Sequence, residues 1–151
     1  MKKIILMLTV LCYLNADDCK IIYSNLYKQD KESLFLTASK LKEYCQNNDK
    51  KACTCYDNYM KLSDKKCNEN DGVYCMVIAT MLGYKDNNFL NYLKKSCDGN
   101  YFDGCYAYGT NLELNYNETK DIETKKEAIF YYKKACKNGI HRACKNLKYI
   151  R

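Results

Sequence analysis

The sequence predicts an all-α protein built from antiparallel helix pairs, each pair stapled by a disulfide bond. Four pairs of cysteines share one spacing of eight positions: Cys45/Cys53, Cys67/Cys75, Cys97/Cys105 and Cys136/Cys144. The chain of 151 residues also contains no proline, the residue that most often interrupts a helix. A recurring interval in a proline-free chain indicates a helical repeat.

The cysteine spacing requires the chain to reverse direction inside each pair. Eight residues of continuous helix rise about 12 Å, whereas the Cα atoms of a disulfide lie within about 7 Å of each other. The third position after each first cysteine holds a residue type that tolerates the left-handed conformation ending a helix: Asn48, Asn70, Asn100 and Gly139. Each unit is therefore expected to be a helix, a short turn and a second helix.

Residues 1–16 have the pattern of a secretory signal peptide. Two lysines precede an apolar run, and small Ala16 stands where a signal peptidase would cut. The apolar run is shorter than the roughly 20 residues of a membrane-spanning helix. Lipidation of Cys12 is disfavoured because bulky Leu11 precedes it. We expect export to the periplasm or the medium, with cleavage near Ala16 and no membrane association afterwards.

Cleavage would remove Cys12, one of eleven cysteines, and leave an even number in an oxidising compartment. Five disulfides are then expected. Elimination pairs Cys19 with Cys55, although Cys53 is close enough to Cys55 to exchange roles with it. A metal site is not expected, because no C-x-x-C occurs and His141 is the sole histidine. No cofactor is expected either.

The net charge of +7 would fall by two with the signal peptide. The lysines are scattered along the sequence, so a nucleic-acid partner is not expected.

The helices follow one another along a single domain. Residues 17–30 are predicted to form an N-terminal capping helix, and residues 31–151 to form about four repeat units. The expected helices of these units cover Glu32–Tyr44, Lys51–Leu62, a pair from Ser63-Asp64 to Leu82, residues 86–97, Tyr101–Leu114 and a last pair from Thr124 onward.

Polar residues suggest where helices begin. Ser63-Asp64 is the predicted cap of the second unit. Thr124 and Glu127 have the spacing of a capping box, and polar residues 115–123 before them are predicted to form a loop.

The last unit resembles a known repeat family. The residues that carry the resemblance are Ala128, Tyr132, Ala135-Cys136, Gly139, Ala143-Cys144 and Leu147, followed by Ser96-Cys97, Gly104-Cys105 and Tyr108-Gly109 in the preceding unit. They are similar to the SEL-one-like repeats of the Helicobacter cysteine-rich proteins, and the likeness covers residues 31–149. The first cysteines of the early units stand closer together than the roughly 34 residues of a tetratricopeptide unit.

The resemblance implies a right-handed superhelical solenoid of helix pairs, each locked by a disulfide. It also implies an exported bacterial protein that binds penicillin-type compounds or related peptidoglycan ligands and acts as a β-lactamase. Many relatives of the broader repeat class are instead protein-binding scaffolds without enzymatic activity, and both functions are kept as hypotheses.

Lactam hydrolysis finds little support in individual residues. Serine β-lactamases use S-x-x-K together with K-T-G. Ser39/Lys42 and Ser63/Lys66 fit the first pattern, but K-T-G and S-D-N are absent, and a zinc lactamase would need several histidines. We assign no catalytic residue, and we expect His141 to be a surface residue of a turn.

Tyrosines are the other candidate feature, with sixteen in the chain and no tryptophan. Tyrosine is enriched at interfaces because an apolar ring carries a polar tip. Most are expected to pack between helices, but Tyr106 and Tyr108 in one helix are predicted to bind a protein or peptide on the concave face of the solenoid. The protein is expected to be a monomer.

Overall fold

The structure is a computed structural model that describes Cys19 and residues 31–150. The predicted signal peptide, residues 1–16, and the predicted capping helix, residues 17–30, therefore lie outside the described residues except for Cys19. Every regular element in residues 31–150 is an α-helix, which confirms the all-α class: α2 Lys31–Gln46, α3 Lys50–Asn68, α4 Gly72–Leu82, α5 Phe89–Asp98, α6 Phe102–Thr119, α7 Ile122–Lys137 and α8 His141–Tyr149. None of these helices is both long and apolar enough to cross a bilayer.

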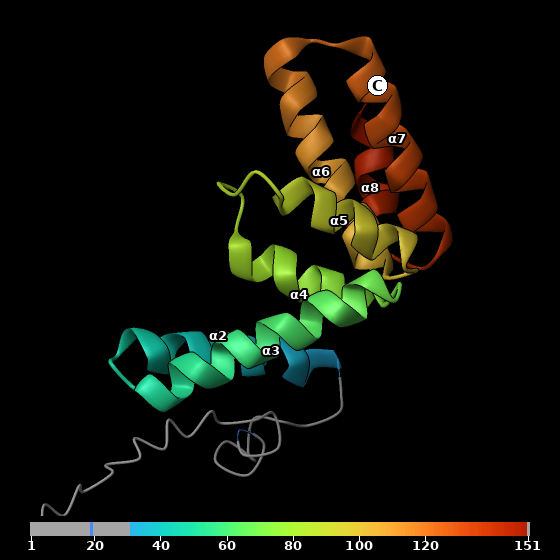
Figure 1. Ribbon diagram of the computed structural model, residues 1–151. Coiled ribbons are helices and arrows are strands. Elements are labelled where there is room, and N and C mark those ends of the chain that lie inside the picture. Colours follow the sequence, from blue (N-terminus) through green and yellow to red (C-terminus); the bar gives the residue numbers. More distant parts are fainter. Residues whose placement is uncertain (1–18, 20–30, 151) are drawn as a thin grey trace, which may run out of the picture.

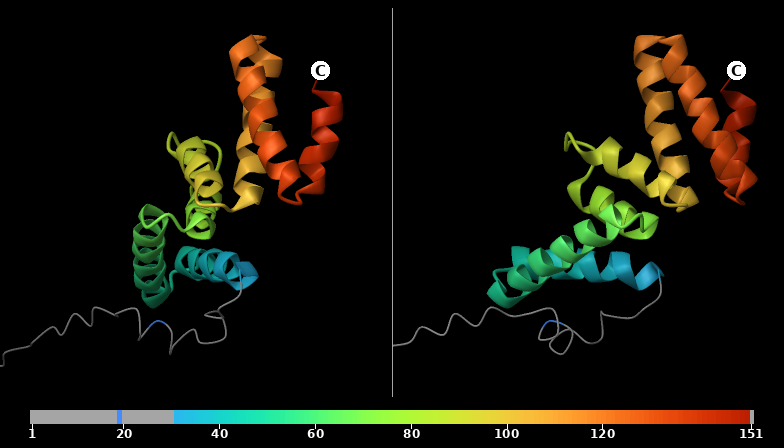
Figure 2. Two further views of the ribbon diagram at one scale, coloured as in Figure 1. Left: turned by 90° about the vertical axis from the view of Figure 1, so that its right-hand side faces the viewer. Right: turned by 45° about the vertical axis from the view of Figure 1, so that its right-hand side comes forward.

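The helices form a stack that grows in sequence order (Figure 1). Each helix packs against the next along the chain. Helices α2 and α3 form one end, α4 and α5 the middle, and α6, α7 and α8 the other end. Both views of Figure 2 place α8 on the side of α6 and α7 that faces away from α5, so α8 closes the stack.

Polar side chains also join helices that are two positions apart in the stack. These hydrogen bonds run from Lys42 Nζ to the Met81 carbonyl (2.9 Å), from the Tyr92 hydroxyl to Asp64 (2.9 Å), from Lys134 Nζ to the Cys97 carbonyl (3.2 Å) and from Asn146 Nδ2 to Glu113 (3.5 Å). Alternate helices are thereby held in register as well as neighbouring ones.

The four turns between stapled helices share one backbone geometry. The positive φ angles expected from the sequence are present at Asn48 (68°), Asn70 (68°), Asn100 (60°) and Gly139 (91°). In each turn this residue donates its N–H to the carbonyl three residues back, and the next residue donates to the carbonyl five residues back. These paired bonds satisfy carbonyls that would otherwise be left at the helix end.

Five disulfides cross-link the described chain, and they are the pairs expected from the sequence. The Cα atoms lie 5.5 Å apart in Cys19–Cys55, 4.4 Å in Cys45–Cys53, 4.7 Å in Cys67–Cys75, 4.4 Å in Cys97–Cys105 and 4.7 Å in Cys136–Cys144. Four of them staple helix pairs beside their turns, and the fifth ties Cys19 to α3. The bonds therefore hold the chain at four of its reversals.

The predicted helix start at Ser63-Asp64 is wrong, because α3 runs without a break from Lys50 to Asn68. Ser63 lies inside that helix and is fully buried, and its hydroxyl donates to the Tyr59 carbonyl at 2.8 Å. Helix α3 carries Cys53 near one end and Cys67 near the other, so two staples share it. This sharing explains why the first two units stand so close in the sequence.

The predicted loop at residues 115–123 is also wrong. Helix α6 continues to Thr119 and α7 begins at Ile122, so two residues make the turn. Lys120 adopts the left-handed conformation (φ 59°). The carboxylate of Asp121 caps α7 by accepting from the Thr124 N–H at 2.9 Å, which replaces the capping box predicted from Thr124.

Close helix contacts in the middle of the stack depend on small residues. A Cβ atom added to Gly104 of α6 would overlap Cβ and Oγ of Ser96 in α5. Ser96 is fully buried, and its hydroxyl donates to the Gly72 carbonyl of α4 at 2.7 Å. One serine therefore contacts two neighbouring helices, and this contact positions the C-terminal helices on the rest of the stack.

Candidate interaction surface on the C-terminal helices

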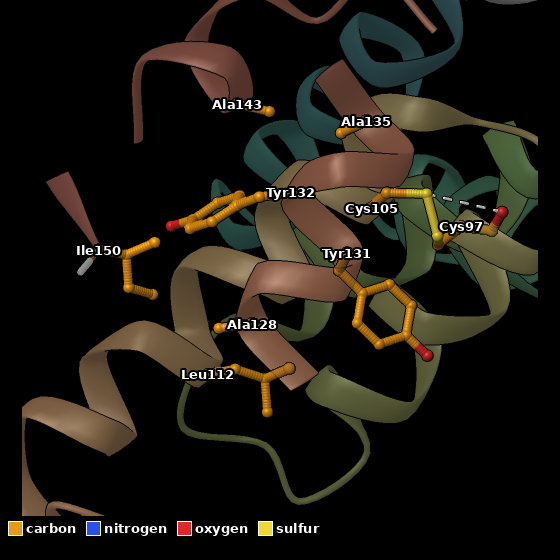
Figure 3. Close-up of a cluster of buried hydrophobic side chains, with 9 residues drawn as sticks. All are labelled: Cys97, Cys105, Leu112, Ala128, Tyr131, Tyr132, Ala135, Ala143 and Ile150. Carbon is orange, nitrogen blue, oxygen red and sulfur yellow. Dashed lines mark hydrogen bonds between the residues drawn. A yellow bond between two sulfur atoms is a disulfide. The ribbon is translucent and has the colours of Figure 1, made fainter. Parts of the chain in front are cut away.

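Helices α6, α7 and α8 enclose the largest apolar cluster of the described chain. Figure 3 shows Tyr131 and Tyr132 of α7 projecting to different sides of their helix, with Tyr132 directed toward Ile150. The disulfide Cys97–Cys105 borders the same cluster. One of its sulfurs, Cys105 Sγ, lies 3.8 Å from the Cys97 carbonyl oxygen. An oxidised sulfur carries no hydrogen, so this is a packing contact and not a hydrogen bond.

The Tyr132 hydroxyl is the centre of a partly buried polar network. It donates to Glu113 Oε2 of α6 at 2.5 Å and accepts from Asn146 Nδ2 of α8 at 2.9 Å. Burial, and then the hydrogen bond to Glu113, raises the pKa of Tyr132 to about 12. The phenol therefore stays protonated at neutral pH, so it acts as a structural donor and not as a nucleophile.

The two tyrosines predicted to bind a partner lie in helix contacts. The Tyr106 ring centroid is 6.0 Å from that of Tyr132, and the Arg142 guanidinium of α8 lies 5.0 Å above the Tyr106 ring. The Tyr108 ring meets Tyr131 edge-on with centroids 4.7 Å apart. Both Tyr106 and Tyr108 are half-buried. A binding role for either ring stays a prediction.

Tyr108 also interacts with a charged side chain. Its hydroxyl donates to Glu127 Oε1 at 3.4 Å. Burial, followed by the Glu127 carboxylate, raises the pKa of Tyr108. This ring thus holds α6 to α7 in the same way that Tyr132 holds α7 to α6 and α8.

The two S-x-x-K pairs are not arranged for nucleophilic chemistry. Ser63 is buried with its hydroxyl donated to a carbonyl, and Lys66 forms an ion pair with Glu69 at 3.1 Å. Ser39 is exposed, but the Lys42 amine that would serve it donates to the Met81 carbonyl instead. Each lysine is therefore engaged away from its serine.

The outward sides of α7 and α8 carry a basic surface that the sequence analysis missed. We call it the basic outer face, and it comprises the exposed side chains of Phe130, Lys133, Lys137, His141, Arg142, Lys145, Lys148 and Tyr149. Residues 128–150 contain no aspartate or glutamate. This local absence of acidic residues was the signal in the sequence, but it is diluted when charge is averaged over the whole chain.

Two acids from neighbouring helices pair with cations of α7 and α8. Asp103 of α6 lies 3.5 Å from the Arg142 guanidinium, and Asp98 of α5 lies 3.8 Å from Lys134 Nζ. Two large apolar side chains accompany the cations, with Phe130 60% and Tyr149 74% exposed. Cations interspersed with exposed aromatic rings are typical of protein interaction surfaces.

Among the described residues, no group of three or more histidine, cysteine, aspartate or glutamate side chains could hold a metal ion. Comparison with protein-family models, with curated proteins and with solved structures finds no match in any of the three.

Proposed function

We propose that the protein is a disulfide-stapled helical scaffold that binds an acidic protein or peptide through the basic outer face of α7 and α8. Five disulfides in a small helical chain indicate an oxidising environment outside the cytoplasm. The observation that carries the proposal is the basic outer face, where exposed cations stand beside exposed Phe130 and Tyr149 and residues 128–150 contain no acid, although Asp103 of α6 pairs with Arg142.

The repeat architecture belongs to the same proposal. We infer a SEL-one-like solenoid from the shared hydrogen-bond pattern of the four turns and the hydrogen bonds between alternate helices, and the right-handed superhelix is what the family resemblance implies. A solenoid contacts a partner along an extended surface with little change in its own shape. The staples favour this role, because a rigid surface loses less conformational entropy when it binds.

The two kinds of side chain on the basic outer face have different roles in binding. The cations attract an acidic partner over a distance and raise its association rate, and salt weakens this effect. Phe130 and Tyr149 supply apolar area that leaves water on contact, and large aromatic rings are the usual hot spots of such interfaces. We therefore expect salt to change the association rate more than the dissociation rate.

Binding of a fluorescent acidic peptide to the oxidised protein tests the proposal. Lys145→Glu with Lys148→Glu should weaken binding about tenfold or more, which corresponds to about 1.4 kcal/mol. The matched control is Lys61→Glu with Lys65→Glu on α3, which makes the same change in net charge at two exposed lysines. Equal losses in the two variants would mean that the peptide senses only net charge, and the proposed surface would be rejected.

The β-lactamase implied by the resemblance makes the opposite prediction. It requires turnover of a chromogenic cephalosporin that one serine substitution abolishes. Ser39→Ala and Ser63→Ala should leave peptide binding unchanged, and we expect no turnover by the unsubstituted protein. Turnover that is lost in either variant, with helical circular dichroism retained, would replace the scaffold by a hydrolase.

A further inference from the structure

The five disulfides differ in how far they are shielded from solvent. Cys19–Cys55, Cys67–Cys75 and Cys97–Cys105 are buried, with no cysteine more than 3% exposed. Cys45–Cys53 and Cys136–Cys144 are half-buried. These two bonds staple the first and the last helix pairs of the described stack (Figure 2). An attacking thiol should therefore reach these two bonds more readily than the three buried ones, although Cys136 also packs against the apolar cluster of α6, α7 and α8.

The two accessible disulfides lie in different electrostatic surroundings. Side chains three or four positions apart on a helix have Cβ atoms about 5–6 Å apart. By this rule the neighbours of Cys136 and Cys144 include exposed Lys133, Lys148 and His141. No acid lies in residues 128–150, and the facing acids Asp98 and Asp103 approach Lys134 and Arg142.

The Cys45–Cys53 bond has balanced surroundings. Lys42 stands three positions before Cys45 and Lys50 three positions before Cys53, while Asp57 stands four positions after Cys53 and Asp49 caps the same helix. The same spacing and similar exposure therefore occur once with excess positive charge and once without. The Cys45–Cys53 bond therefore serves as an internal control for the effect of charge on Cys136–Cys144.

The two sulfurs of the last staple are not equivalent. Cys144 lies in the first turn of α8, and Cys136 is the last residue but one of α7. The positive end of a helix lowers the pKa of a thiol, and the negative end opposes this. In thiol–disulfide exchange the sulfur with the lower thiol pKa leaves faster. An attack should therefore occur at Cys136 and release Cys144.

We propose that Cys136–Cys144 is a site of thiol–disulfide exchange with small anionic thiols, a property separate from the partner binding proposed above. The attacking thiolate forms a bond to Cys136 Sγ while the Cys136–Cys144 bond breaks, and the electron pair leaves on Cys144 as a thiolate. A second thiolate can then displace Cys136 from the mixed disulfide and form a small-molecule disulfide. Exchange removes the covalent link between α7 and α8 and leaves the other four disulfides intact.

The test is brief exposure of the oxidised protein to glutathione, followed by alkylation of free thiols and peptide mapping. We expect glutathione on Cys136 and the alkyl group on Cys144 before any buried pair reacts. Cysteamine, a cationic thiol, should react at least about tenfold more slowly there at equal thiolate concentration, whereas at Cys45–Cys53 the two thiols should differ little. High salt should remove the difference.

Lys133→Glu with Lys148→Glu should abolish the preference for glutathione while leaving circular dichroism unchanged. Lys61→Glu with Lys65→Glu serves as the control with equal charge change and should keep the preference. Reaction of the buried pairs as fast as Cys136–Cys144 would overturn the proposal. So would glutathione found mainly on Cys144, or a preference in the unsubstituted protein that salt does not weaken.

Discussion

The asparagines of the stapled turns suit the left-handed backbone conformation that these turns require. Asn48, Asn70 and Asn100 all have positive φ, which asparagine tolerates better than most side chains. Lys120 has the same conformation (φ 59°) in the turn between α6 and α7. Lys120 Nζ lies 5.7 Å from the Tyr116 ring centroid, but a lysine has a steric cost in the left-handed conformation that glycine lacks, so the backbone of this turn is strained.

Lys120→Gly should stabilise the protein by about 0.5–1 kcal/mol, because glycine adopts positive φ without steric cost. Urea denaturation measures the change. Asn70→Gly is the comparison and should change stability less, because asparagine already suits its turn. A loss of stability in Lys120→Gly would show that the exposed lysine side chain matters more than the backbone.

Tyr132→Phe should destabilise the protein by about 1–3 kcal/mol, since it removes a buried hydroxyl and leaves Glu113 and Asn146 without their shared partner. Phe130→Ala at an exposed position should cost much less. Thermal unfolding of the two variants at neutral pH measures the difference in stability. Similar losses in both variants would contradict a special role for the network.

The raised pKa of Tyr132 also gives a pH dependence. Its folded-state pKa is about 12, whereas tyrosine ionises near 10 in an unfolded chain. The unfolded state therefore loses its proton first, and stability that is complete below pH 10 should fall as the pH rises toward 12. The fall should be shallower in Tyr132→Phe. Tyr131, whose pKa burial also raises to about 12, should account for part of the remaining slope.

At the scale of the element, the structures that sequence could predict are those specified locally. The cysteine interval, the turn residue and the helix-forming composition lie within a dozen residues of one another, and the stapled turns came out as expected. The helix start predicted at Ser63 was wrong because serine is common both at helix caps and inside helices, where its hydroxyl donates to a backbone carbonyl as it does in α3. Which of the two it adopts depends on contacts with other helices.

The network at Tyr132 could not be predicted for the same reason. Glu113, Tyr132 and Asn146 come from three helices and meet only once those helices have packed. The C-terminal end of α6 shows that packing between helices also determines how long a helix is. Residues 115–119 are polar, but the helix continues because it forms an antiparallel pair with α7 and a two-residue turn suffices.

Gly104→Ala should cost about 1–3 kcal/mol, because the new methyl group would overlap Ser96 between α5 and α6. Asn117→Ala, at an exposed position of the same helix, should change stability by less than about 0.5 kcal/mol. Denaturant unfolding of the two variants measures the difference. If Gly104→Ala is as stable as the unsubstituted protein, α5 and α6 can separate without loss.

For the whole molecule, the staples are a large part of stability. Each of the four short loops contributes about 2.5 kcal/mol by chain entropy, and the longer Cys19–Cys55 loop contributes about 4 kcal/mol. Their sum is comparable to the 5–15 kcal/mol of a typical domain. Full reduction should therefore remove most of the helical circular dichroism at 37 °C. A reduced protein that keeps its helicity and melting point would contradict this.

The positions of the disulfides also determine which proteolytic cleavages would divide the chain into fragments without a covalent link. A protease that nicks a stapled turn, for example at Lys50, leaves the two pieces joined through Cys45–Cys53. The turn at residues 83–88 and the turn at Lys120-Asp121 have no disulfide across them. A nick at Lys85 or Lys120 therefore leaves fragments held only by noncovalent packing. These two turns are therefore where proteolysis would divide the protein into separate fragments.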